Sequence, residues 1–227
     1  VMQRVKTHLS LSNQKRALYQ QVKLQTKELI STRNNIIQKL GRAAEFKDNE
    51  TGDHVQRMSK YAFVLATAFG MDEAAADMLM NAAPMHDIGK IGVPDHILKK
   101  AGRLNEDEWQ VMKEHAAFGG KILDEKNPSP LMEMAKTVAI THHEKWDGSG
   151  YPKGLKAQEI PLTGRIIAIA DVFDALTSAR PYKPAWTIER SVELIKSESG
   201  KHFDPELVDC FVNNLDEILA IKAQFSE

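Results

Sequence analysis

The sequence contains a single cysteine, Cys210, among its 227 residues, so no disulfide can form within the chain. Structural disulfides are characteristic of oxidising compartments, and a chain without them is consistent with a reducing one. We therefore expect a cytoplasmic protein. Its stability must come from a packed core, for which a hydrophobic content of 42% is sufficient.

Long apolar runs and excess charge of one sign are also missing. The longest nearly apolar stretch, residues 62–70, is far shorter than the roughly 18 residues that a membrane span needs, and the N-terminus has no apolar signal-peptide core. Thirty basic and 31 acidic residues nearly cancel. No overall field attracts long nucleic acid or an anionic membrane, so we expect neither as a partner, and any phosphate ligand must be held by local groups.

Proline is absent from the first 47 residues, and Gly41 is the only glycine there. Apolar residues recur in this polar segment at heptad spacing, although Gln25 and Thr32 interrupt one of the two rows. The rows consist of Leu11 and Leu18 in one position and Val22, Leu29 and Ile36 in the other. The pattern predicts a long helix over residues 1–47, either a coiled coil or an amphipathic helix packed on its own domain.

Alternating, strand-like runs are missing beyond Glu50, where apolar residues keep helical spacing throughout. This pattern predicts an all-α fold. The expected helices cover residues 51–69, 72–88, 106–125, 131–143, 164–178, 188–198 and 205–224. Asn105 with Glu108 is typical of a capping box, and Asp204 before Pro205 is typical of a helix N-cap.

Residues 144–163 form a long segment rich in glycine and proline, which is too long for a mere connector in a compact helical domain. It follows two adjacent histidines, His142 and His143, and contains the turn GSGYP. Glycines allow backbone amides to approach a phosphate, and Tyr151 offers a hydroxyl and a ring face. We expect this loop to be functional.

Imidazoles and carboxylates occur at spacings that suit metal binding. Glu50 and His54 are four residues apart and share one helix face, and His86 is followed directly by Asp87. Asp171 lies in the apolar run IIAIADVFDAL, where a carboxylate is costly unless it is paired or bound to a cation. Asp174, one turn later, is either a partner to this site or a surface carboxylate.

The full set of candidate ligands is larger than one tetrahedral zinc ion requires, so more than one metal ion is expected. The set comprises Glu50, His54, His86, Asp87, His115, His142, His143 and Asp171. Nitrogen and oxygen donors suit iron, manganese, nickel or zinc. The remaining histidines, His8, His96 and His202, are assigned no role.

Five segments carry these residues in a fixed order, and together they strongly resemble the HD-GYP family, a subgroup of the HD-domain phosphohydrolases. They are ETGDH (50–54), HDIGKIGVPD (86–95), MKEHAAFGG (112–120), HHEKWDGSGYPKGL (142–155) and ADVFDALTSARPYK (170–183). The resemblance covers about residues 45–215. It implies an HD-domain helical bundle with a long N-terminal helix, in which residues 48–227 are the catalytic domain.

The resemblance also implies an activity, the hydrolysis of cyclic di-GMP to linear pGpG and then GMP. The reaction would use two or three divalent metal ions, most often iron. Asp87 would bridge the ions and Lys90 would lie beside them, while Glu50 and His54 would hold a third ion. Contacts to the dinucleotide are implied for Gly150, Tyr151, Arg180 and Lys183.

Two other functions stay open at this stage. A receptor could bind the dinucleotide without turnover, and a hydrolase could prefer cyclic GMP-AMP. No motif position is degenerate, which favours the enzyme. The N-terminal sequence VMQRVKTHLSL resembles the junction between a receiver domain and an HD-GYP output domain. We therefore expect a regulator of a two-component system that forms a homodimer through its N-terminal helix.

Overall fold

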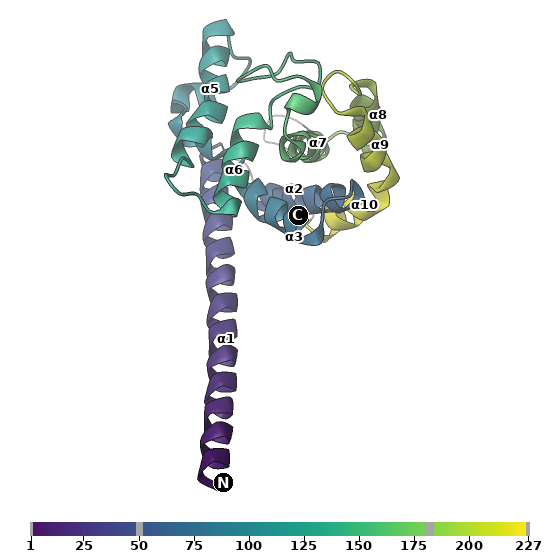
Figure 1. Ribbon diagram of the computed structural model, residues 1–227. Helices are drawn as coiled ribbons and strands as arrows, with labels where there is room; N and C mark the ends of the chain where they lie inside the picture. Colours follow the sequence, from purple (N-terminus) through teal and green to yellow (C-terminus); the bar gives the residue numbers. More distant parts are fainter. Residues whose placement is uncertain (1, 49–51, 180–183, 226–227) are drawn as a thin grey trace. The chain divides into compact units, whose positions relative to one another are not determined.

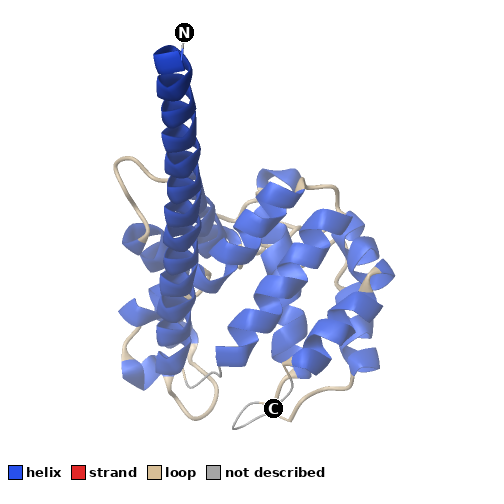
Figure 2. Cartoon of the chain, turned by 90° about the horizontal axis from the view of Figure 1, so that it is seen from below, coloured by secondary structure: helices blue, strands red, loops and turns tan. Residues whose placement is uncertain are grey.

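The computed structural model describes residues 2–48, 52–179 and 184–225, with described side chains beginning at Leu11 (Figure 1). Glu50, Arg180 and Lys183 therefore lie outside the described residues. Within the described ranges all regular elements are helical and no strand is formed (Figure 2), which confirms the all-α prediction. No helix in these ranges combines the length and apolar character that crossing a membrane requires.

Helix α1 (Met2–Lys47) is continuous, as the pattern predicted. By its internal contacts the chain divides into two compact units, Val1–Ile36 and Ile37–Glu227, so residues 37–47 of α1 belong to the second unit. In the first unit the side chains of both heptad rows are exposed, for example Leu18 at 61% and Leu29 at 70%. A coiled-coil seam requires apolar side chains that are available in this way.

The second unit is built around two adjacent helices, α2 (Gly52–Ala68) and α7 (Leu162–Thr177). Helix α7 packs on α2, α6 (Pro130–Thr141), α8 (Ile188–Ser197) and α9 (Pro205–Asn213) (Figure 1). Three fully buried aromatic side chains join α2, α7 and α9. The ring centroids of Tyr61 and Phe173 are 5.8 Å apart, and those of Phe173 and Phe211 are 5.0 Å apart. This core fixes the separation of α2 and α7.

The remaining helices surround this pair. α3 (Glu73–Ala82) and α10 (Leu215–Gln224) lie against α2, while α5 (Glu106–Ile122) packs on α6 and on the short α4 (Asp95–Leu98). Within the second unit, the end of α1 packs closely on the segment after α3. A side chain at Gly41 would collide with Pro84, so glycine permits the approach.

Two predicted helices differ from the observed ones. The helix expected over 72–88 ends at Ala82, and two 3₁₀ turns follow, η1 (Ala83–Met85) and η2 (Ile88–Gly92). Pro84 has no N–H to continue the α-helical ladder, which accounts for the change. The helix expected over 205–224 is divided at Asn214 into α9 and α10. The Asn105–Glu108 capping box and the Asp204 N-cap are both present.

Candidate metal centre

The turn between η1 and η2 carries His86 and Asp87. Gly89, two residues later, lies so close to the backbone of α5 that any side chain there would collide with the carbonyl group of His115. This contact brings the 86–92 segment directly against α5. The Asp87 side chain therefore points toward His115 in the middle of α5.

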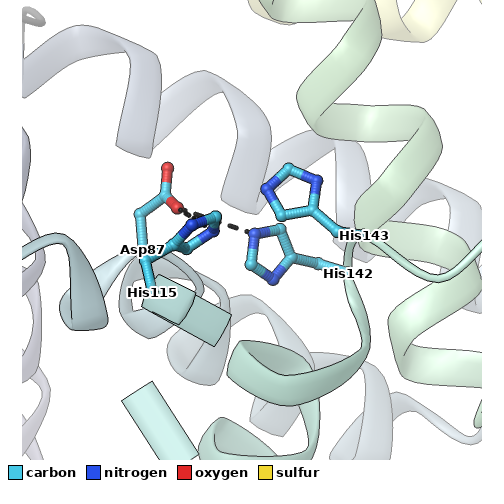
Figure 3. A group of neighbouring side chains, drawn as sticks. All are labelled: Asp87, His115, His142 and His143. Atoms are coloured by element: carbon cyan, nitrogen blue, oxygen red, sulfur yellow. Dashed lines mark ion pairs between the residues drawn. The ribbon is translucent and has the colours of Figure 1, made fainter. Parts of the chain in front are cut away.

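The first donor cluster contains Asp87, His115, His142 and His143, whose donor atoms all lie within 4.8 Å of one another (Figure 3). The Oδ1 atom of Asp87 is 3.3 Å from Nε2 of His115 and 3.6 Å from Nε2 of His142. His142 is the C-cap of α6 and His143 is the next residue, where the backbone leaves the helix. The two adjacent rings can therefore both point into one cluster.

Three of the rings are oriented by the same backbone contact. The Nδ1–H group of each donates to a main-chain carbonyl three or four residues earlier, at 3.0 Å for His86, 2.7 Å for His115 and 3.1 Å for His142. Each Nε2 atom is thereby directed inward. These three Nε2 atoms and Asp87 Oδ1 are buried without a hydrogen-bond partner among the described residues. Buried polar atoms of this kind are rare in folded proteins, and an ion or a water bound between them would satisfy them.

The second donor cluster contains Glu45, His54 and His86, again with donor atoms within 4.8 Å of one another. Nε2 of His54 lies 3.7 Å from the Glu45 carboxylate and 3.5 Å from that of Asp171. The two clusters meet at the neighbouring side chains of His86 and Asp87, where Nε2 of His86 is 3.1 Å from Oδ2 of Asp87. One side-chain pair therefore connects two adjacent sets of metal-ligating atoms.

The protonation of the rings differs between the clusters. Burial lowers the pKa of His115 to about 4 and holds the pKa of His143 well below its usual value, so both are neutral donors near pH 7. Burial also opposes charge on His86, but the Asp87 carboxylate outweighs it and raises the pKa of His86 to about 10. Without a metal ion, His86 is therefore protonated near pH 7, and its positive charge balances the negative charge of Asp87. Neutral imidazoles and carboxylates fit divalent iron, manganese, nickel or zinc.

The fully buried carboxylate of α7 is Asp174, whereas the side chain of Asp171, which was expected to be buried, is 19% exposed. Asp174 accepts hydrogen bonds from Nδ1 of His54 at 2.8 Å and from Nε of Arg57 at 2.7 Å. Asp174 is therefore a partner of the site and not a surface carboxylate. It orients His54 so that Nε2 faces the second donor cluster.

The loop after the histidine pair folds back over it. The Tyr151 ring stacks on the His143 ring, with centroids 4.7 Å apart and planes 27° apart. The backbone N–H of Tyr151 donates a hydrogen bond to the main-chain carbonyl of His143. Gly150 lies against the backbone of Glu144 and leaves no room for a side chain. The buried Glu144 carboxylate accepts the N–H groups of Lys153 and Leu155 at 2.8 and 3.0 Å. Sequence reasoning missed this role of Glu144, although an acidic residue directly after two histidines was a usable signal.

The end of α1 also reaches the site. Lys90 Nζ lies 2.9 Å from Oδ2 of Asp87 and bonds the carboxylate of Asp48. Lys47 Nζ donates to the main-chain carbonyls of Lys90, Ile91 and Val93, at 3.2, 2.8 and 2.7 Å. None of Glu45, Lys47 and Asp48 was singled out from the sequence. His96 and His202, the other histidines whose side chains are described, belong to neither donor cluster in the described part of the chain.

Comparison with known proteins places this arrangement in a family. The model of the HD domain matches residues 40–207. The 3'3'-cGAMP-specific phosphodiesterase 2 of Vibrio cholerae serotype O1 is 46% identical over 88% of this chain and 38% of its own length. The cyclic di-GMP phosphodiesterase response regulator RpfG of Xanthomonas campestris pv. campestris is 38% identical over 96% of this chain and 59% of its own length.

A solved structure shares the fold. The HDG"Y"P protein from Bdellovibrio bacteriovorus superposes with a TM-score of 0.58 at 17% identity, over 82% of this chain and 64% of that one. The chain thus spans 38% and 59% of the length of the two curated relatives. The family model covers most of the described residues, the HD motif joins the two donor clusters, and the GYP turn packs on His143. The chain therefore belongs to the HD-GYP family of HD-domain proteins.

Proposed function

We propose that this chain is a metal-dependent phosphodiesterase that hydrolyses cyclic di-GMP to linear pGpG and then to GMP. The observation that carries the proposal is the pair of donor clusters joined at His86 and Asp87 beneath the Tyr151 turn. Two divalent ions held there would supply an activated water and neutralise charge on the phosphate oxygens. Iron is the first choice of metal, with manganese, nickel or zinc as alternatives.

The protein groups take complementary roles in this proposal. Asp87 belongs to the first donor cluster with His115, His142 and His143 and also contacts His86 of the second, so it is the residue that two ions would share. Lys90, 2.9 Å from Asp87, places an ammonium group where charge develops on the phosphoryl group or the leaving oxygen. Arg180 and Lys183, outside the described residues, are proposed to bind the phosphates as a bidentate partner and a point charge.

The second donor cluster is proposed to draw on three carboxylates. Glu50 is the family's candidate at the spacing ETGDH and lies outside the described residues. Glu45, on α1, is buried at 1% exposure beside His54. With Asp171 also near His54, these carboxylates would be available to hold a further ion, whose positive charge would favour rebinding of the terminal phosphate of pGpG.

The direct test is a chromatographic time course on anaerobically purified protein whose metal content is measured on the same sample. We expect at least two ions per chain, a transient rise of pGpG and final accumulation of GMP. Asp87→Ala should lose both metal and activity, whereas Arg180→Ala should keep its metal and bind substrate more weakly. A lasting plateau of pGpG would contradict the second step, and unchanged cyclic di-GMP would favour the receptor function.

A hybrid cyclic GMP-AMP is the second candidate substrate, because the relative that is 46% identical carries the name of a 3'3'-cGAMP-specific phosphodiesterase. Competition between the two dinucleotides in one reaction measures the ratio of their kcat/KM values directly. We expect cyclic di-GMP to be consumed first. Faster loss of cyclic GMP-AMP would assign the chain to the other substrate.

We also propose that the chain is the output part of a two-component regulator and dimerises through α1. The relative named as a response regulator and the exposed heptad rows of α1 support this proposal. Leu18→Lys combined with Leu29→Lys should yield monomers in analytical ultracentrifugation, with Lys23→Ala as a polar control on the same helix. A monomeric unmodified protein would contradict the dimer.

A further inference from the structure

Trp109 lies near the start of α5 with 45% of its surface exposed, next to the turn that covers the metal centre. Its ring centroid is 6.1 Å from that of Tyr151, and the two planes are nearly perpendicular at 82°. Tyr151 in turn stacks on His143, a member of the first donor cluster. A row of aromatic rings therefore leads from the metal centre to an indole that faces solvent.

A positive charge lies on the same face. Lys113 is one helical turn after Trp109, and its Nζ atom is 6.0 Å from the centroid of the Tyr151 ring. An exposed indole, a tyrosine and an ammonium group next to a phosphodiester site match the chemistry of a nucleotide, which combines an aromatic base with an anionic backbone.

A purely structural role for Trp109 has to be considered. Trp109 is the fourth residue of a capped helix, and Leu104 precedes the Asn105 cap, which is the arrangement of a hydrophobic staple. Leu104 packs against the small core of Val93, Ile97 and Leu98, whereas Trp109 is absent from the side chains packed on that core in the described part of the chain. A leucine would serve a staple equally well, so the staple does not account for a large ring left almost half exposed.

We propose that Trp109 is the stacking platform for one purine base of the cyclic dinucleotide, an inference that rests on the proposed function. When one phosphodiester lies at the metal centre, the base attached to it extends outward past Tyr151. The perpendicular rings of Trp109 and Tyr151 form a corner in which a purine stacks on one ring and presents its edge to the other. The positive charge of Lys113 favours the anionic ligand on this face.

Two substitutions of Trp109 separate stacking from the staple. Trp109→Leu keeps an apolar side chain for the staple and removes the ring, whereas Trp109→Phe keeps a ring. Ile122→Ala is the matched control, because Ile122 is a similarly exposed apolar residue at the other end of α5, at 49%. Each manganese-loaded protein is titrated calorimetrically with the phosphorothioate analogue of cyclic di-GMP, and kcat and KM are measured with cyclic di-GMP.

We expect Trp109→Leu to weaken binding about 5- to 150-fold, the range for loss of one base–aromatic stack. KM should rise with little change in kcat, because stacking on a remote base acts equally in the ground state and the transition state. Trp109→Phe should retain most of the affinity and Ile122→Ala all of it. Hydrolysis of methyl 4-nitrophenyl phosphate, a diester without a base, should be unchanged in every variant.

The other possible results distinguish the stacking role of Trp109 from the proposed hydrolysis. Unchanged affinity in Trp109→Leu, or no binding by the unmodified protein, would overturn the stacking role. An equal loss on methyl 4-nitrophenyl phosphate would show that the substitution distorts the metal centre, which also overturns it. Binding that depends on Trp109 without turnover would support the platform and refute the proposed hydrolysis.

Discussion

Asp174 joins α2 to α7 beneath the metal centre, and its replacement by asparagine tests how the second donor cluster is held. The side chain is fully buried and accepts hydrogen bonds from His54 Nδ1 and from Nε and Nη2 of Arg57, at 2.8, 2.7 and 2.9 Å. Burial opposes charge on this carboxyl, but the two cationic partners outweigh it and hold the pKa of Asp174 below its usual range. Asp174→Asn preserves the shape of the side chain and removes its charge.

The expected loss of stability follows from the unpaired Arg57 guanidinium that the substitution leaves behind. Arg57 is only 5% exposed and would keep a buried guanidinium without its carboxylate. Removing one partner of a buried ion pair costs about 3–5 kcal/mol. In a chain of this size about 1 kcal/mol changes Tm by about 2–4 °C, so Asp174→Asn should lower Tm by roughly 6–20 °C. Because His54 also loses the acceptor that orients it, metal affinity should fall about 10- to 100-fold.

Differential scanning calorimetry of the metal-free protein measures the first effect, and competition with a chelator for manganese measures the second. Asp209→Asn, an exposed carboxylate on α9, is the matched control. In an Arg57→Met background the Tm loss caused by Asp174→Asn should shrink, since no guanidinium is then left unpaired. A Tm loss no greater than that of Asp209→Asn, or one that is unchanged in the Arg57→Met background, would refute this reasoning.

Three further outcomes are expected. Glu45→Gln should reduce the metal bound per chain, measured by elemental analysis, while the first donor cluster remains loaded; an unchanged metal content would remove Glu45 from the ligands. Chelation should lower Tm by roughly 8–16 °C if free metal stands about 1,000-fold above its Kd, and identical melting with and without chelator would contradict a native metal site. Burial lowers the pKa of His202 to about 4, so the free energy of unfolding should decline as pH falls from about 6.5 toward 4. His202→Gln should flatten that decline in a pH series of Tm values. Parallel Tm profiles for the two proteins would exclude His202 as the cause.

The sequence predicted most helices well because their apolar residues recur at helical spacing and so stay on one face over several turns. It failed where a local feature changes the backbone without changing composition. Pro84 and the close approach of Gly89 to α5 convert the end of the 72–88 helix into 3₁₀ turns. At Asn214 the chain starts a new helix, although the apolar residues on both sides read as one periodic run.

The histidines and Asp87 could be predicted because imidazoles are unusual in helical cores and Asp87 directly follows one of them, whereas the burial of the two carboxylates on α7 could not. Asp171 and Asp174 share one face of α7, and only the packing of α7 on Arg57 decides which of them is buried. A buried carboxylate is placed by its partners, and these lie on a different helix more than a hundred residues away.

The end of α1 is the part of the site that local sequence describes least. Residues 37–47 read as the tail of a polar helix, yet within the second unit Glu45 lies beside His54, and Lys47 holds three carbonyls of the segment that follows Asp87. Asp48 pairs with Lys90, which itself contacts Asp87. Any displacement of this segment must break charge-assisted hydrogen bonds to the loop that carries His86 and Asp87, and must also change the separation of Glu45 from His54. A shift in the position of the last turns of α1 therefore changes the geometry of the two donor clusters as well.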